Sequence, residues 1–124
     1  VRGHNLVVRI GDRCDAKGVK IVAWDKSVLI GSDCLFAKGV EIRSSDIHSV
    51  FDRRTGHRLN EPEEVTVGNH VWVAAEVVIL KGSRIEAGSI VGTRSVVTGG
   101  FDKPNSLIVG NPARLVRSNI AWRR

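Results

Sequence analysis

Aliphatic residues recur at every sixth position along the second half of the chain. They are Val67, Val73, Ile79, Ile85, Val91 and Val97. A small or β-branched residue follows each of the first five by four positions: Val71, Val77, Ser83, Ser89 and Ser95. A period of six fits neither a 3.6-residue helix nor the alternation of a simple strand, and a fixed period indicates stacked repeats. The pattern therefore predicts a parallel β-helix, a solenoid whose coils have three short sides and whose core contains the aliphatic residues of the repeat.

The repeat continues upstream with interruptions. The segments IGDRC at 10–14 and IGSDC at 30–34 are near-duplicates, and each ends in a cysteine, Cys14 or Cys34. We expect the two segments in adjacent coils, with the two cysteines stacked in the core as reduced thiols. Reduced thiols favour a cytoplasmic protein, and the sequence has no apolar run long enough to predict a membrane span.

Two segments depart from the repeat. Residues 43–64 are polar and interrupt two in-phase stretches, which predicts a loop excursion whose root is held by the solenoid. Residues 98–124 follow the last repeat and are expected to cap the open end of the coils. Within this cap, Pro112 and the apolar positions after it predict a short C-terminal helix. We therefore expect one all-β domain over residues 1–124. Since the chain contains no methionine, we also expect it to be truncated at its N-terminus.

The charge balance points to an anionic partner. The net charge is +6, but the basic residues are scattered and no nucleic-acid-binding module is visible. An acidic glycan or a polyanionic small cofactor accounts for the charge as well as nucleic acid does, and non-specific surface charge is a further explanation. We expect no nucleic-acid partner.

Four stretches of the sequence resemble a known family. They are IGSDCLFAKGVEI, SDIHS, the long run VTVGNHVWVAAEVVILKGSRIEAGSIVGTRSVVT, and NSLIVGNPARLVR. All four are similar to the hexapeptide-repeat acyltransferases, in particular to the sugar O-acetyltransferases. The resemblance implies a left-handed coil, acetyl-CoA as the acyl donor and a sugar or glycan acceptor. It also implies direct transfer in a ternary complex, a homotrimer with active sites between subunits, and no need for a metal.

The resemblance also implies a general base. It places the family's catalytic histidine at His48, and the tryptophan that lines the site is Trp72, 24 residues later. In an extended backbone Asp46 would point the same way as His48 and could orient its ring, although a local turn contact is as plausible for an Asp here. Glu41 is an alternative orienting acid. The other histidines, at positions 4, 57 and 70, are expected to be surface residues.

A second group of residues would hold the donor. Ala75, Thr93 and Thr98 align with positions that contact coenzyme A in the family, and Arg114 and Arg117 match the basic residues that meet its phosphates. The chain departs from the family at Gly99, where a lysine is common, and Lys103 is a candidate to replace that charge.

Two alternatives to O-acetylation remain open from the sequence. One is N-acetylation of an amino sugar or a xenobiotic. The other is a catalytically inactive solenoid that serves as a scaffold, and binding of acetyl-CoA would distinguish a scaffold from either enzyme.

Overall fold

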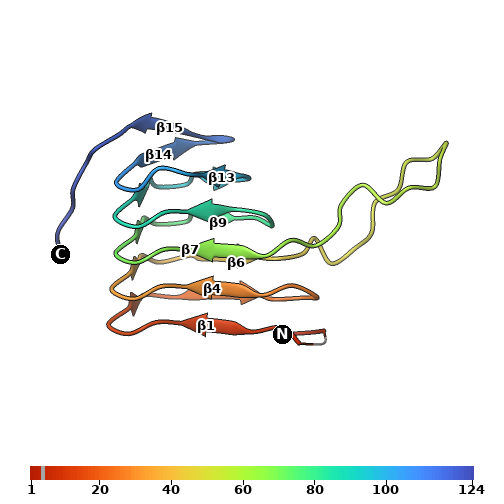
Figure 1. Cartoon of the computed structure of the whole chain (residues 1–124), viewed down its shortest axis with the longest axis horizontal. Helices are drawn as coiled ribbons and strands as arrows, with labels where there is room; N and C mark the ends of the chain where they lie inside the picture. The colour runs from red at the N-terminus through yellow and green to blue at the C-terminus, as the bar shows by residue number, and fades with distance from the viewer. Residues whose placement is uncertain (4) are drawn as a thin grey trace.

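The computed structural model describes residues 1–3 and 5–124, which form a stack of about five three-sided coils (Figure 1). Each strand pairs with the strand three places along the chain, because every coil adds one strand to each of three sheets. All pairings between these strands are parallel except the last, between β14 and β15. The predicted parallel β-helix is therefore confirmed.

Each sheet forms one side of the solenoid. The first sheet has the order β1 (Val8–Ile10), β4 (Val28–Ile30), β7 (Val65–Val67), β10 (Arg84–Ile85), β13 (Gly100–Phe101). The second has the order β15 (Ala113–Arg117), β14 (Leu107–Gly110), β11 (Ile90–Val91), β8 (Trp72–Val73), β5 (Leu35–Phe36), β2 (Asp15–Ala16). The third has the order β12 (Val96–Val97), β9 (Val78–Ile79), β6 (Val40–Arg43), β3 (Val19–Val22).

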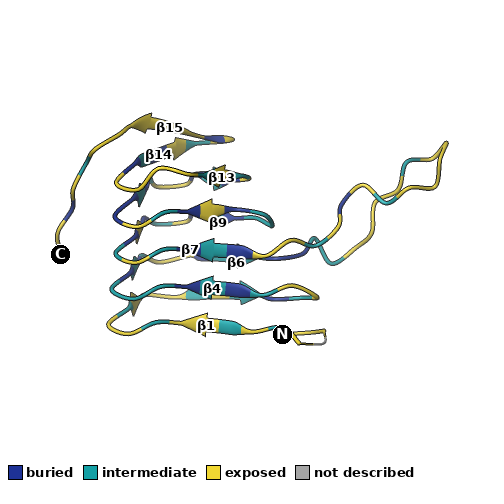
Figure 2. Ribbon diagram, viewed as in Figure 1, coloured by how far each residue is buried: buried dark blue, intermediate teal, exposed yellow. Residues whose placement is uncertain are grey.

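The six-residue repeat supplies the core, as predicted. All the repeat's aliphatic residues are buried, and buried segments recur along the stack (Figure 2). Each inward residue stacks on its equivalent in the next coil, as Val73 does on Val91. The repeat's serines are buried as well. Their hydroxyls bond backbone groups of a neighbouring coil, for example Ser83 Oγ with the carbonyl of Val97 at 3.0 Å. Burying these serines is therefore inexpensive.

Glycines allow the corners of adjacent coils to approach closely. A Cβ atom added at Gly31 would lie 2.8 Å from the backbone nitrogen of Asn69, and one at Gly68 would lie 2.7 Å from that of Ala87. Because both near atoms belong to the backbone, these corners tolerate no side chain.

Cys34 is buried and Cys14 is half-buried, and both are free thiols. Their segments occupy adjacent coils, since β2 pairs with β5 in parallel. Cys34 therefore matches its prediction, whereas Cys14 is less enclosed than expected.

Between β6 and β7 the chain leaves the stack and projects away from it (Figure 1). A single antiparallel bridge, between Phe51 and Arg58, draws its two limbs together. Near the tip, the carboxylate of Asp52 accepts hydrogen bonds from the backbone N–H groups of Arg54 and Thr55. Most of this excursion is exposed (Figure 2).

The predicted C-terminal helix is wrong, and the described residues contain no helix. After Pro112 the chain forms β15, which returns along β14 as an antiparallel hairpin. An added strand satisfies the free backbone groups of β14, which a helix could not do. Leu115 and Val116 are exposed while Trp122 is buried, so the apolar residues of this segment do not form one helical face.

Candidate functional site

His48 lies at the root of the excursion, in a tight turn. The backbone N–H of His48 donates to the carbonyl of Asp46 at 2.8 Å, and Ile47 between them has a φ of 71°. A β-branched residue rarely adopts this left-handed conformation, so the surroundings must hold the turn in place. The prediction that Asp46 and His48 point the same way on an extended backbone is therefore wrong.

Asn60, on the returning limb of the excursion, holds this turn. Its side chain is buried, with 8% exposed, and its Nδ2 donates to the carbonyl of His48 at 2.8 Å and to Asp46 Oδ2 at 2.9 Å. Its Oδ1 accepts from the backbone N–H of Val50 at 2.7 Å. The sequence offered no specific signal for Asn60, which is one polar residue among many in this segment. Its role depends on how the two limbs meet.

Both carboxylates considered as partners of His48 are engaged elsewhere in the part of the chain that the structure describes. Asp46 Oδ2 lies 3.0 Å from Lys81 Nζ, and hydrogen bonds first from Asn60 and then from Lys81 lower the pKa of Asp46. Glu41 Oε2 accepts from Arg43 Nε at 2.9 Å. The His48 side chain itself is exposed.

Trp72 lies on the outer face of the second sheet, with 36% of its surface exposed. Its neighbours in the strand register are Leu35 and Ile90, so Trp72 lies on a face that also carries other large apolar residues. Trp122 lies beside it, with ring centroids 6.1 Å apart. His48 follows β6 of the third sheet, so the two residues paired by the resemblance belong to different sides of the solenoid.

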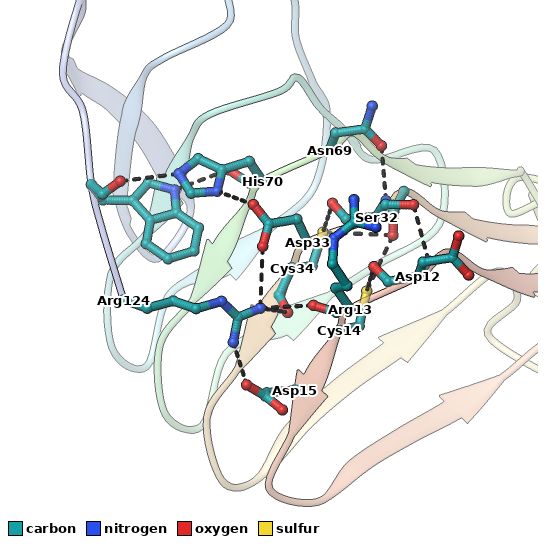
Figure 3. A network of polar contacts seen from close by, with 12 residues as sticks. Asp12, Arg13, Cys14, Asp15, Ser32, Asp33, Cys34, Asn69, His70 and Arg124 are labelled. Atoms are coloured by element: carbon teal, nitrogen blue, oxygen red, sulfur yellow. Dashed lines mark hydrogen bonds and ion pairs between the residues drawn. The ribbon is translucent and has the colours of Figure 1, made fainter.

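His70 is half-buried rather than a free surface residue, which corrects its prediction (Figure 3). Its ring stacks on Trp122 with centroids 3.9 Å apart. Nδ1 lies 2.7 Å from Asp33 Oδ2, and Nε2 lies 3.0 Å from the carbonyl of Trp122. His57 is exposed near the tip of the excursion, as expected, and His4 lies outside the described residues.

The candidate donor-binding residues occupy two corners. Ala75 and Thr93 lie at the corner between the second and third sheets, one coil apart, and the backbone N–H of Arg94 donates to the carbonyl of Ala75 at 2.9 Å. Thr98 follows β12 at the corner between the third and first sheets, the side from which the excursion leaves. The structure thus places Ala75 beside Thr93 and puts Thr98 at a different corner.

Arg114 and Arg117 lie on β15 with exposed side chains, and neither forms an ion pair with the described residues. The pairing with β14 matches Ile108 with Leu115 and Leu107 with Arg117, so Val116 is an extra, bulged residue. In a regular strand, residues three positions apart lie on opposite faces. The bulge at Val116 interrupts that alternation between Arg114 and Arg117.

Among the described residues, no group of three or more His, Cys, Asp and Glu side chains could hold a metal ion. No helix in that part of the chain is long and apolar enough to cross a membrane.

Comparison with known proteins identifies the family. The chain is 41% identical over 103 residues to the polysialic acid O-acetyltransferase of Neisseria meningitidis, covering 83% of this chain and 48% of that protein. It is 30% identical, over an alignment of 137 positions, to the Escherichia coli (strain K12) protein named "Putative lipopolysaccharide biosynthesis O-acetyl transferase WbbJ". That alignment covers 93% of this chain and 69% of that protein. No family model matches the chain.

The solved structures agree with these relatives. The crystal structure of the polySia-specific acetyltransferase NeuO superposes with a TM-score of 0.84 at 33% identity, covering 96% of this chain and 54% of that one. The chain spans about half the length of most of the curated relatives it matches. By sequence and by fold, this chain belongs to the hexapeptide-repeat acetyltransferases of left-handed β-helix architecture.

Proposed function

We propose that this protein is an acetyl-CoA-dependent O-acetyltransferase that acts on a hydroxyl group of a sugar or polysaccharide. The names of its relatives support this assignment, since they include polysialic acid and galactoside O-acetyltransferases. The net charge of +6 is suited to an acidic glycan acceptor.

The observation that carries the proposal is that His48 has an exposed side chain on a fixed backbone. The side chain is exposed, while its backbone is held by Asn60 in a turn at the root of the excursion. A positioned, accessible imidazole is suited to accept the proton of an attacking hydroxyl. The new bond forms between the acceptor oxygen and the acetyl carbon, and the bond from that carbon to sulfur breaks. His48 then returns the proton to the departing thiolate. The transfer is direct, within a ternary complex.

The donor would lie along corners that carry small side chains. Ala75 and Thr93 are small residues at one corner, and Thr98 is a small residue at another. Arg114 and Arg117 are exposed cations without an ion-pair partner in the described structure, and guanidinium groups match phosphate geometry. The small residues and the unpaired guanidinium groups support coenzyme A as the donor.

The complete site would require a second copy of the chain. His48 and Trp72 lie on different sides of one solenoid, so another subunit would bring one against the other. The excursion also exposes apolar side chains that a neighbouring subunit would cover: Val50 is 51% exposed, Phe51 55% and Leu59 63%. We propose a homotrimer with its sites between subunits. The free thiols of Cys14 and Cys34 favour a cytoplasmic protein.

The test is transfer of radiolabelled acetyl groups from acetyl-CoA to a panel of acceptors that includes polysialic acid, galactosides and maltose. His48→Ala should lower turnover by roughly 10²- to 10⁴-fold and leave acetyl-CoA affinity nearly unchanged. Turnover of the unmodified protein should fall on acidification, because only a neutral imidazole accepts a proton.

His57→Ala is the matched control, since it removes a histidine from the same excursion, and it should be nearly silent. If His48→Ala kept more than about a tenth of the turnover, His48 would not be the base. Failure to bind acetyl-CoA at all would favour the scaffold, and transfer to amines alone would favour N-acetylation.

A further inference from the structure

The C-terminal strap, residues 118–124, lies along the outside of the solenoid (Figure 1). The backbone N–H of Ile120 donates to the carbonyl of Asn105 at 2.9 Å, near one end of the stack. At the other end of the strap, Arg124 forms an ion pair with Asp15 on β2 and donates to the carbonyl of Cys34 at 3.2 Å. Between these ends lies Trp122, which packs against the side of the solenoid that carries Trp72.

The ring of His70 holds the middle of the strap, and both of its nitrogens face hydrogen-bond acceptors (Figure 3). Nδ1 faces the carboxylate of Asp33 at 2.7 Å, and Nε2 faces the carbonyl of Trp122 at 3.0 Å. A neutral imidazole carries one N–H and can donate to only one of them, whereas an imidazolium donates to both. A positive ring would also be attracted to the Trp122 indole on which it stacks, with centroids 3.9 Å apart.

The charges around His70 have opposing effects. Asp33 attracts a positive ring, and it remains ionised because its hydrogen bond with His70 lowers its pKa. Arg124 lies 3.5 Å from the other oxygen of Asp33 and opposes the positive ring, but its charge is shared with Asp15. Burial raises the pKa of the Cys34 thiol to about 11, so this thiol stays neutral. The direct contacts of His70 therefore match the protonated ring.

We propose that the strap is a proton-dependent cover for the side of the solenoid around Trp72. When His70 is protonated the strap is held down, and Trp122 lies against Trp72. When His70 loses its second proton, one acceptor in this network loses its donor, and the strap opens more often. If Trp72 lines the active site, as the proposed function holds, access to that site rises with pH.

The strap can be followed by acrylamide quenching of tryptophan fluorescence. Trp24→Phe removes the remaining tryptophan, so the signal comes from Trp72 and Trp122 alone. Losing one hydrogen bond should raise the ratio of open to closed strap by roughly 2- to 10-fold. In this background, quenching should therefore be weaker at acid pH, where the ring carries two protons, than at alkaline pH, where it carries one.

His70→Gln keeps hydrogen-bonding capacity but cannot titrate, so its quenching should be independent of pH. His57→Gln, the matched control, should keep the pH response of the background. Asp33→Asn should weaken the response, and it tests the same contact if His70→Gln does not fold. A flat profile in the Trp24→Phe protein, or an unchanged response in both His70→Gln and Asp33→Asn, would overturn the proposal.

This readout does not depend on catalysis. A protein without transferase activity that showed the expected quenching profile would reject only the enzymatic assignment. An active enzyme with a flat profile would reject only the strap.

Discussion

The excursion between β6 and β7 and the C-terminal strap are both irregular segments, yet they lie very differently against the coils. The excursion is held at its root, where Asn60 joins its two limbs, and the rest projects with Phe51 and Leu59 exposed. The strap is held near both ends and in the middle, by Ile120, Trp122 and Arg124. A segment that is fixed only at its root can reach another molecule. A segment that is fixed along its length covers the surface of its own solenoid. In both segments, hydrogen bonds hold the backbone in place: those of Asn60 in the excursion, and those of Trp122 and Arg124 in the strap.

Both segments depend on the coil stack, so disrupting the stack should have the largest effect. Ile85→Asp places a carboxylate without a partner in the core, which should cost several kcal/mol and unfold the protein. Urea unfolding followed by circular dichroism measures the loss. Ile85→Val is the control and should cost about 0.5–1.5 kcal/mol. An Ile85→Asp protein with the unfolding midpoint of the wild type would contradict the assignment of this position to the core.

The C-terminal hairpin, which precedes the strap, should matter for the donor. The double variant Arg114→Ala, Arg117→Ala should weaken coenzyme A binding by about 10- to 150-fold, because charge-assisted contacts to its phosphates are lost. Calorimetry at low and high salt measures this, and the wild type should bind more weakly at high salt. Arg53→Ala, Arg54→Ala removes the same charge from the excursion. Equal losses in both double variants would indicate a general effect of charge and not a phosphate site.

The root of the excursion should matter for turnover and not for donor affinity. Asn60→Ala removes the bonds that hold the His48 turn, and a small displacement of a catalytic group is costly, so kcat should fall by about 10-fold. The control is Asp52→Ala, which removes two hydrogen bonds near the tip of the same excursion and should leave kcat unchanged. Equal kcat values for the two variants, both folded, would show that Asn60 does not position His48.

Acid should affect the two segments in opposite directions, and this is the smallest expected effect. Contacts with Asn60 and Lys81 lower the pKa of Asp46, so their stabilisation is present above the ordinary Asp range. It is lost as the pH falls through the lowered value, below about 4. The strap should instead tighten on acidification, because a doubly protonated His70 donates to both of its acceptors. Hydrogen exchange of residues 43–64 and 118–124, followed from alkaline pH down to about pH 3, measures both effects. If both segments were loosened by acid, the two segments would not differ in their response.

The regular part of the fold could be predicted because its cause is local. Each coil repeats the same six-residue pattern, and each inward residue meets its own equivalent in the next coil, as Val73 meets Val91. The place of the excursion was visible as well, since an interruption in a strict repeat must leave the stack. The C-terminal hairpin was not, because Pro112 and the apolar residues after it suit a helix, whereas the free edge of β14 selects a strand.

The sequence by itself determined the solenoid, its core and its family, and it singled out His48 and Trp72 as a pair. Only the tertiary structure decided their surroundings. It placed them on different sides of one coil stack, closed the His48 turn with Asn60, and put His70 between Asp33 and Trp122. The repeat could be read because its contacts join equivalent residues at a constant spacing. The contacts of His70, by contrast, join residues 37 and 52 positions apart, a separation that no period encodes.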